Sequence, residues 1–397
     1  MQRIYLLKGK LQSYSWGGFH YIPDLLSFSN QENKPYAEYW MGAHPSHSST
    51  ISYGTLSLAD FIKSQGEIVL GSTVYHAFKS LPYLFKILDV RQMLSIQVHP
   101  SKEEAVIGFE MEEVAAIPIT APHRNYKDRN HKPELMVALS DFWLLHGFKP
   151  EADLSKTLTA VRQLNFLGPH FDKGGYKALF SFVMQMEQGE VDTVIDSLAR
   201  QVMPLYKQNK IDKHKEDFWA ARAIDTFCSE PPYDRGIFCI YLFNLLHLKK
   251  GQGIYQPAGM PHAYLEGQNV EIMANSDNVL RAGLTDKHID VSELLKHTVC
   301  TPTIPDVLHH TGGSEITYPS PAKEFALQQY HLKGEEKKLY TESAEILFVI
   351  EGNAKIATEA ESLSIQKGES VFIMADTDII LQCDASAVVF RASVGAV

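Results

Sequence analysis

The sequence has few cysteines, no long hydrophobic run and no excess of positive charge. Its 397 residues include only four cysteines, and none of them stands close to another: Cys228, Cys239, Cys300 and Cys383. This spacing excludes the cysteine pairs of zinc ribbons and redox dithiols, so we expect reduced, buried thiols. No segment approaches the ~20 apolar residues of a membrane-spanning helix, and charged residues interrupt the N-terminus before a secretory apolar core could form. We therefore expect a cytoplasmic protein without a membrane partner.

Negative charge predominates, with a formal net charge of −10 at pH 7. This balance argues against nucleic acid and anionic membranes as partners. It does not exclude a phosphorylated small molecule, because exposed charges are screened over ~8 Å at physiological salt and a local basic cluster decides what binds. The chain offers candidates for such a cluster: Lys86, Lys132, Arg281 and Lys287.

The chain is too long for a single hydrophobic core, since single cores stop growing near ~250–300 residues. Short strands separated by Gly, Pro, Ser and Asn dominate its first part, and further on apolar residues such as Val191, Ile195 and Leu198 recur at helical spacing. Strands are then expected to resume, and the apolar run 236–243 is interpreted as a strand buried on both faces. The sequence predicts a mainly β fold with a helical insertion, divided into residues 1–148, 149–226, 227–316 and 317–397.

The last unit repeats part of an earlier one. Residues 250–258 (KGQGIYQPA) reappear in outline as residues 367–375 (KGESVFIMA). In that register Ile379 falls where His262 stands in the first copy, and the last histidine of the chain is His331. Residues 317–397 are therefore predicted to form an all-β unit without metal ligands, with a role in packing or assembly.

Three segments carry side chains of the kinds that bind metal ions. Strict alternation around Gln97 and His99 predicts a strand that points both residues to its polar face. Glu134 opens a second predicted strand, and His262 follows a turn rich in Pro and Gly. These four residues are the predicted shell of nitrogen and oxygen ligands. The set suits zinc, but its two histidines and one carboxylate equally fit the facial triad of non-haem iron enzymes.

A helix is predicted to begin directly after Pro100. Ser101 and Glu104 match the Ser-x-x-Glu capping box, in which each side chain accepts a hydrogen bond from the backbone of the other residue. Ser101 is therefore expected to have a structural role, although it stands close to His99.

Longer stretches of the sequence resemble one enzyme family. Besides the three segments with metal-binding side chains, residues 36–45 (YAEYWMGAHP), 81–86 (LPYLFK), 144–148 (LLHGF) and above all 270–287 (VEIMANSDNVLRAGLTDK) are similar to its signature stretches. The family is that of the type I phosphomannose isomerases, zinc enzymes of the cupin superfamily. The resemblance runs from the N-terminus to His288 and more loosely beyond it, and Tyr39 stands where a leucine is more usual.

The resemblance implies a fold and an activity. The fold would consist of cupin (jelly-roll) domains plus an α-helical domain, with the catalytic cupin domain formed by residues 1–148 and 227–316 together. The activity would be the interconversion of mannose 6-phosphate and fructose 6-phosphate through an enediol, with one Zn²⁺ per chain. Such an enzyme supplies mannose carbon to glycolysis or mannose 6-phosphate to GDP-mannose biosynthesis. We expect a monomer whose partner is a sugar phosphate.

The resemblance also implies roles for residues around the metal. Arg281 stands at the position regarded as catalytic, and its planar cation can grip a phosphate or a developing enediolate. Glu271 or Lys132 is the candidate proton shuttle, since a metal-bound His99 has only its outer nitrogen free. The residues expected to bind substrate are Lys287, Tyr264, Asp277, Ser95, Lys86 and Glu38.

Plainer interpretations stand beside these roles. Glu271 can simply pair with a neighbouring cation, Asp277 can shape the turn at residues 275–278, and Lys287 can be a solvated surface lysine. His44 and His47 are interpreted as loop residues with structural hydrogen bonds.

Two other functions fit parts of the pattern. A cupin oxygenase would use iron on the same ligands, and metal analysis with an oxygen-uptake assay would distinguish it. A non-catalytic sugar-phosphate sensor would bind the substrate without converting it. Such a sensor has little need for an open metal position with a lysine beside it.

Overall fold

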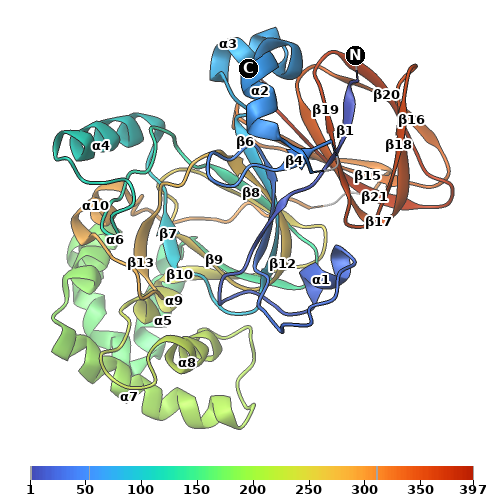
Figure 1. Ribbon diagram of the computed structural model, residues 1–397. Helices are drawn as coiled ribbons and strands as arrows, with labels where there is room; N and C mark the ends of the chain where they lie inside the picture. The colour runs from blue at the N-terminus through green and yellow to red at the C-terminus, as the bar shows by residue number, and fades with distance from the viewer. Residues whose placement is uncertain (1, 53, 310–311, 397) are drawn as a thin grey trace.

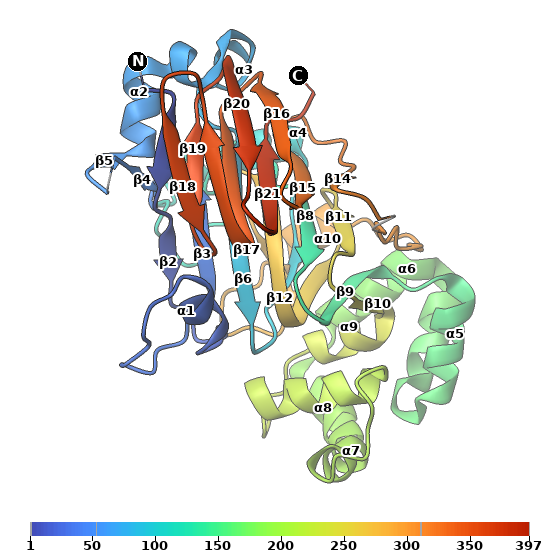
Figure 2. The same ribbon diagram turned by 90° about the vertical axis from the view of Figure 1, so that its right-hand side faces the viewer.

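The computed structural model describes residues 2–52, 54–309 and 312–396. It consists of two β units that lie side by side and a helical unit at one end (Figures 1 and 2). This arrangement agrees with the predicted mainly β fold with a helical insertion.

Ten strands of the described chain form one sheet, which we call the central sheet. Its main path runs β10-β9-β12-β6-β3-β2, and β7, β8, β11 and β13 attach to it. The strands are Lys10–Gln12 (β2), Glu38–Gly42 (β3), Tyr83–Val90 (β6), Ile96–Val98 (β7), Glu134–Ala138 (β8), Phe142–Phe148 (β9), Phe243–Leu248 (β10), Gly253–Gln256 (β11), His262–Ala274 (β12) and Leu280–Gly283 (β13). Strand β12 connects the sheet, because it pairs with β6, β7, β8 and β9.

Nine strands form the second sheet, which we call the C-terminal sheet. Its main path runs β1-β19-β17-β21-β15-β14, with β16, β18 and β20 attached. The strands are Ile4–Leu7 (β1), Glu315–Tyr318 (β14), Ala326–Leu332 (β15), Glu336–Thr341 (β16), Glu345–Ala357 (β17), Ser362–Gln366 (β18), Ser370–Ile373 (β19), Thr377–Gln382 (β20) and Ala387–Ser393 (β21). A further short pair consists of Thr50–Ile51 (β4) and Leu56–Ser57 (β5).

The first strand of the chain belongs to this C-terminal sheet. Strand β1 pairs antiparallel with β19, and Ile4 lies opposite Ile373. The two ends of the chain are thus joined in one unit, as the blue strand among the red ones shows in Figure 2. Nothing in the first eight residues indicated this pairing, because a four-residue apolar strand carries no information about its partner.

The two sheets pack face to face through apolar side chains, and the polar residues of the central sheet point the other way. Phe85 and Ile87 of β6 share one buried cluster with Phe348 and Phe372 of the C-terminal sheet. Lys86 stands between them in the sequence and therefore points to the opposite face. That opposite face carries the candidate functional site.

The helical unit follows β9. It consists of Glu151–Ala160 (α5), Arg162–Leu167 (η1), Gly168–Gln185 (α6), Gln188–Lys207 (α7), Glu216–Phe227 (α8) and Gly236–Leu242 (α9). The other helices of the described chain are Tyr21–Leu25 (α1), Leu58–Leu70 (α2), Ser72–Phe78 (α3), Lys102–Val114 (α4) and Val291–His297 (α10). The helices around residues 149–226 agree with the predicted insertion, while the domain boundaries themselves stay a prediction.

The expectation of a strand over residues 236–243 is wrong, since most of this run is the helix α9. Strand β10 begins only at Phe243. Every residue of α9 is buried, and an apolar run without periodicity cannot distinguish a buried helix from a buried strand. The Asp234 side chain accepts a hydrogen bond from the Gly236 backbone N–H at 2.7 Å. This contact satisfies one of the free N–H groups at the start of the helix.

The predicted start of helix α4 is confirmed. Ser101 is the N-cap residue, and its side chain and that of Glu104 form both hydrogen bonds of the capping box. The expected structural role of Ser101 is therefore the role that the structure shows.

The two copies of the internal repeat share a turn in which a glycine with positive φ precedes a strand. Gly251 has φ +87° and Gly368 has φ +84°, and each precedes a strand, β11 in the first copy and β19 in the second. Ile379, which falls at the position of His262, is 2% exposed and packs in the apolar interior of the C-terminal unit.

None of the described helices is long and apolar enough to cross a membrane. The four cysteines are free thiols, two of them buried and two partly buried.

Candidate metal centre and adjoining pocket

The chain brings three metal-binding side chains together from the ends of three strands. His99 directly follows β7, Glu134 opens β8 and His262 opens β12. Strand pairing fixes their relative positions, because His262 pairs with Gln97 of β7 and Glu134 pairs with Gln256 of β11. One potential ligand atom from each of the three residues lies within 4.8 Å of the others, and all three residues are buried.

Backbone carbonyls orient both imidazole rings. The Nδ1 atom of His99 lies 2.7 Å from the Asn278 carbonyl oxygen, and Nδ1 of His262 lies 2.9 Å from the Met260 carbonyl oxygen. Each Nδ1 must therefore carry the hydrogen, which leaves the Nε2 lone pair available as a metal ligand. Both Nε2 atoms face Glu134, at 3.5 Å for His99 and 3.2 Å for His262.

The residues present fit a bound divalent cation. The Nε2 atom of His99 is fully buried, and no hydrogen-bond partner for it exists among the described residues. A buried polar atom without a partner is costly. A metal ion bound by two neutral imidazoles and one carboxylate would satisfy it.

Local charges keep this group in the protonation states that a metal requires. Burial alone would raise the pKa of Glu134, but Lys132 and His99 hold it well below its ordinary value, and Lys132 Nζ lies 3.2 Å from Glu134 Oε1. Burial, followed by the charge of Lys132, lowers the pKa of His99. These shifts favour an ionised Glu134 carboxylate and a neutral His99 imidazole at neutral pH.

Gln97 lies beside this group without belonging to the three ligands. Its backbone pairs with His262 on one side and Arg281 on the other. A small cavity of about 50 Å³ is lined by Gln97 together with Glu134 and His262. Its position is compatible with a fourth ligand, and that role stays a prediction.

A second buried group stands next to the ligands and is centred on Lys86. Its ammonium lies 3.5 Å from Glu38 Oε2 and 3.3 Å from Glu271 Oε2. It also lies over the ring of Trp40, 4.9 Å from the centroid. The hydroxyl group of Tyr264 donates to Glu271 at 2.7 Å. The plainer interpretation of Glu271 as a partner of a neighbouring cation therefore describes a contact that is present.

Burial and the neighbouring charges set the protonation of this group. Burial would lower the pKa of Lys86, but the two carboxylates outweigh it and raise the pKa. Burial and then the charge of Glu134 raise the pKa of Glu271. Burial and the Glu271 charge also raise the pKa of Tyr264 well above its ordinary value. Lys86 is thus a fixed cation, and Glu271 accepts a proton more readily than Glu134 does.

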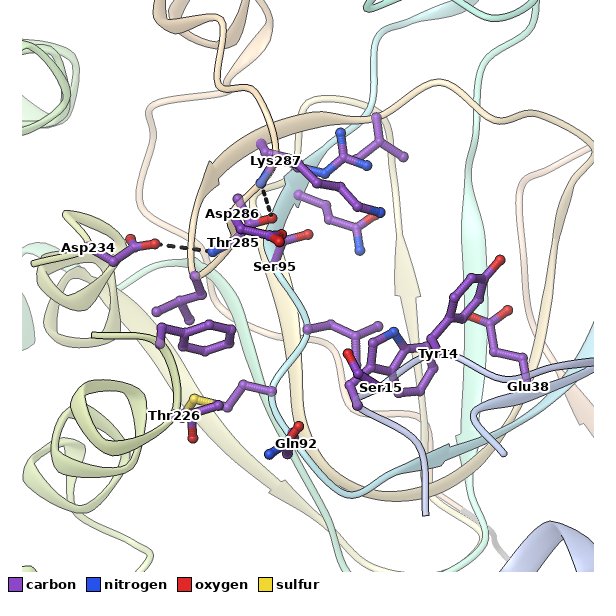
Figure 3. A pocket seen from close by; sticks show the side chains of 18 of the residues that line it. Tyr14, Ser15, Glu38, Gln92, Ser95, Thr226, Asp234, Thr285, Asp286 and Lys287 are labelled. Atoms are coloured by element: carbon purple, nitrogen blue, oxygen red, sulfur yellow. Dashed lines mark hydrogen bonds between the residues drawn. The ribbon is translucent and has the colours of Figure 1, made fainter. Parts of the chain in front are cut away.

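A large pocket of about 1090 Å³ opens from this polar face. The four cations proposed as a basic cluster all line it: Lys86, Lys132, Arg281 and Lys287. Ser95, Glu38 and Asp277 line it as well. In Figure 3, Lys287 and Ser95 lie at one end of the pocket, and Glu38 lies across from them. The structure therefore brings together all the residues predicted to bind the metal ion and the substrate, around one pocket and the metal centre beside it.

Of the four cations that line the pocket, Arg281 and Lys287 have no carboxylate partner among the residues that the structure describes. Within the described residues, no carboxylate lies within 4 Å of either charged group, whereas Lys86 has two such partners and Lys132 has one. Burial lowers the pKa of both groups, and Asp286 partly opposes this effect. Two unpaired cations in one pocket are suited to an anionic ligand.

Asp277 lies at the wall of the pocket, where His44 holds it. The two side chains approach to 3.2 Å, and the backbone N–H of Ser46 donates to Nδ1 of His44. His44 therefore has the structural hydrogen bonds that the sequence analysis expected. The neighbouring turn is stabilised by Asp128, which accepts from the backbone N–H of Asp277 at 2.8 Å.

The sequence analysis missed several residues of the pocket wall. Tyr14 and Trp16 line the pocket, with ring centroids 5.8 Å apart and an interplanar angle of 25°. Thr226, Phe227 and Tyr233 come to the same pocket from the helical unit and the segment after it. The two aromatic residues shortly before Gly17 were only a weak indication of a ligand-binding wall. The sequence of a helical segment does not indicate that the end of the helix lies against a strand that is distant along the chain.

Comparisons with known proteins decide the family. Residues 4–151 match the family model of the phosphomannose isomerase type I catalytic domain, and residues 314–388 match the mannose-6-phosphate isomerase cupin domain. The mannose-6-phosphate isomerase of Salmonella typhimurium is 37% identical over 380 residues, which cover 93% of this chain and 94% of the relative. The chain belongs to the type I phosphomannose isomerase family. The human mannose-6-phosphate isomerase is 33% identical over 96% of this chain and 95% of its own length.

Solved structures support the same assignment. A zinc-bound mannose 6-phosphate isomerase superimposes with a TM-score of 0.88 at 34% identity, over the whole of both chains. The Salmonella typhimurium enzyme bound to fructose 6-phosphate and zinc superimposes equally well, with a TM-score of 0.88 at 34% identity. The resemblance noted in the sequence is thereby confirmed, and so is the cupin fold class.

Proposed function

We propose that this protein interconverts mannose 6-phosphate and fructose 6-phosphate with one bound zinc ion. The observation that carries the proposal is the junction of two features in one site. The buried ligand group His99, Glu134 and His262 adjoins a pocket with the two unpaired cations Arg281 and Lys287. A metal site next to an anion-binding pocket suits a metal-dependent sugar-phosphate isomerase.

The reaction moves a proton between C1 and C2 of the sugar and a hydrogen between the two oxygens. When bound, zinc supplies a Lewis acid that stabilises negative charge on these oxygens. His99, Glu134 and His262 would hold the ion, and Gln97 is the proposed fourth ligand. The backbone carbonyls behind the two imidazoles keep the rings in the orientation that ligation needs.

Proton transfer is assigned to Glu271 or Lys132. Burial raises the pKa of Glu271, which brings a carboxyl group closer to the range where it both accepts and releases protons at neutral pH. Tyr264 and Lys86 hold that carboxyl group in place. Lys132 lies nearer to the metal ligand, at 3.2 Å from Glu134, and its positive charge also suits stabilisation of the enediolate.

Arg281 and Lys287 are assigned to the negative charges of the substrate. The guanidinium of Arg281 offers a planar fork for a phosphate or an enediolate. Lys287 offers a mobile point charge at the exposed end of the pocket. Ser95, Asp277 and Glu38 are assigned to hydrogen bonds with the sugar, since all three line the same pocket and carry side-chain oxygen atoms.

The two other functions fit less well. An oxygenase using iron on the same ligands gives no reason for the two unpaired cations in the pocket. A non-catalytic sensor gives no reason for a buried metal group with an ionised carboxylate beside Lys132. Family membership also favours the isomerase over both.

The test is an assay of the purified chain on mannose 6-phosphate, coupled to detection of fructose 6-phosphate and to measurement of the bound metal by mass spectrometry. We expect turnover that stops on chelation and returns with zinc. Oxygen uptake without isomerisation would assign the oxygenase, and binding without turnover would assign the sensor. We further propose that the enzyme is a cytoplasmic monomer that serves mannose metabolism and GDP-mannose biosynthesis. It is proposed to bind neither nucleic acid nor a membrane. Its domains are proposed to comprise residues 1–148, 149–226, 227–316 and 317–397.

A further inference from the structure

One hydrogen bond between side chains connects the C-terminal unit to the segment that carries Lys132 and Glu134. Nε2 of His131 lies 2.6 Å from Oε1 of Glu324. Only 25% of the His131 side chain and 11% of the Glu324 side chain is exposed. Glu324 belongs to the connection between β14 and β15, some 190 residues away along the chain. Neither residue belongs to the metal ligands or to the lining of the large pocket.

We infer that Glu324 is a positioning residue for Lys132, which it holds in place through His131. The inference rests on the proposed function, because it assigns the C-terminal unit a part in that reaction. Its physical basis is the order of the residues: His131 immediately precedes Lys132, and its side chain is bound on the side of the C-terminal unit while Lys132 reaches into the pocket.

The chain on either side of His131 is already attached to the rest of the site. The Asn130 carbonyl oxygen accepts from the Asn278 side chain at 2.8 Å. The Pro133 carbonyl oxygen accepts from the Ala274 backbone N–H at 3.1 Å. The contact of His131 with Glu324 adds an attachment between Asn130 and Pro133, and it connects this segment to the C-terminal unit. The peptide that bears Lys132 is therefore held from two directions.

Glu324 is itself on a rigid support. The next residue, Phe325, is fully buried in the apolar cluster between the two sheets, and Leu135 of β8 belongs to the same cluster. The Lys323 carbonyl oxygen accepts a hydrogen bond from the Gly395 backbone N–H at 3.1 Å. Burial opposes ionisation of Glu324, but His131 holds its pKa below the ordinary value, so the carboxylate is charged. A hydrogen bond to an ionised and largely buried carboxylate fixes geometry better than an exposed contact.

Precise placement of a catalytic group has a large effect on rate, since misplacement by about 1 Å can cost about 100-fold. Loss of this placement should lower kcat with little effect on KM, because Arg281 and Lys287, the cations assigned to the negative charges of the substrate, lie outside this segment. The C-terminal unit then has a catalytic purpose without having metal ligands of its own.

The experiment compares Glu324→Ala, Glu324→Gln and His131→Ala with a matched control. The control is Glu351→Ala, which removes the other cross-unit pair, Lys250 with Glu351 at 2.5 Å, at a distance from the pocket lining. Activity on mannose 6-phosphate is expressed per bound zinc. We expect Glu324→Ala and His131→Ala each to lower kcat about 10-fold or more with KM within about twofold. The double variant should be no worse than either single one. Glu324→Gln, which can still accept the hydrogen bond, should recover most of the rate.

Amide hydrogen exchange provides a readout that does not depend on activity. Peptides covering residues 128–134 should exchange faster in Glu324→Ala than in the wild type, and they should be unchanged in Glu351→Ala. Wild-type kcat with unchanged exchange in Glu324→Ala would overturn the inference, as would a loss of activity that the loss of zinc accounts for entirely. If the wild type itself does not turn over mannose 6-phosphate, the proposed function fails, and hydrogen exchange alone then decides whether Glu324 holds this segment.

Discussion

Arg281 is a partly buried cation without a carboxylate partner in the described part of the chain, and this makes its chemical role testable. If its guanidinium meets charge that grows toward the enediolate, Arg281→Lys should lower kcat by roughly 100-fold, because removing one preorganised donor typically costs that much. If it only anchors the phosphate of the bound substrate, the loss should appear mainly in KM. Steady-state kinetics on mannose 6-phosphate at equal zinc content distinguish the two. Unchanged kcat and KM would show that Arg281 has neither role.

Substitution of His262 tests whether the three-residue group binds the metal ion. His262→Ala should remove most of the zinc, because only two other strong ligands remain and the ligand group has none to spare. His146→Gln is the matched control, since His146 is also buried and lies directly opposite His262 across β9 and β12. We expect full zinc content in the control by metal mass spectrometry. Full occupancy in His262→Ala would contradict the assignment of the centre.

The position of a site residue was predictable where a short local pattern determined the face of the strand to which its side chain points. Alternation around Gln97 and His99 and the family signature at residues 270–287 predicted residues that the structure brings together around one pocket and the group beside it, while their roles stay a prediction. The pairing of Asp277 with His44, and the lining by Tyr14 and Trp16, depended on loops whose course no local pattern determines. These contacts needed the structure.

At the scale of elements, the turns of the internal repeat depend on glycine. Gly368 has φ +84°, and a Cβ atom there would meet the Leu25 carbonyl oxygen at 2.0 Å. Gly334 lies in the same unit with φ +75°, but its nearest contact would be an ordinary one at 3.9 Å. Gly334→Ala should therefore cost only the backbone strain, about 1–2 kcal/mol. Gly368→Ala should cost about 1–3 kcal/mol more, because the backbone of α1 must move.

Thermal or denaturant unfolding of the two variants measures this difference. Both substitutions introduce the same methyl group at a positive φ, so that the extra loss in Gly368→Ala reports the contact with Leu25 alone. Equal stability of the two variants would show that the segment near Leu25 yields at no cost.

Helix α9 shows why one element was misinterpreted while its neighbours were not. Periodicity distinguishes helix from strand only when one face is polar, as in α7, where buried residues recur at helical spacing. All residues of α9 are buried, and the deciding information is the packing of this segment between the helical unit and the sheet. Tertiary packing overrides local preference in such segments.

At the scale of the whole molecule, the β units do not follow the order of the sequence, because the first strand joins the sheet formed by the last part of the chain. The strands at Gln97, Glu134 and His262, the helical insertion and the repeat were predictable, because each has a local pattern. The partner of β1 was not, because a short apolar strand can complete the edge of any sheet. Its pairing with β19 means that the N-terminus stabilises a unit formed mainly by the last eighty or so residues of the chain.

This arrangement predicts an effect of the N-terminus on the distant C-terminal unit. Ile4 is fully buried in the interior of that unit, in one cluster with Ile373 and Ile379. Ile4→Ala should destabilise the C-terminal unit by about 2–5 kcal/mol, because it leaves a cavity in an apolar interior. The control is Leu11→Ala on β2, where the side chain is 39% exposed and the cost should stay below about 1 kcal/mol.

Hydrogen exchange resolved by peptide shows where the destabilisation falls. In Ile4→Ala, amides of β19 and β17 should exchange faster, while those of β12 in the central sheet should keep most of their protection, because the metal centre and its strand pairings do not include β1. Zinc content should remain at one per chain. Faster exchange confined to β12 or to its neighbour β6 would instead mean that the first strand mainly supports the central sheet. The assignment of β1 to the C-terminal unit as its stabilising edge would then be wrong, whatever the total loss of stability.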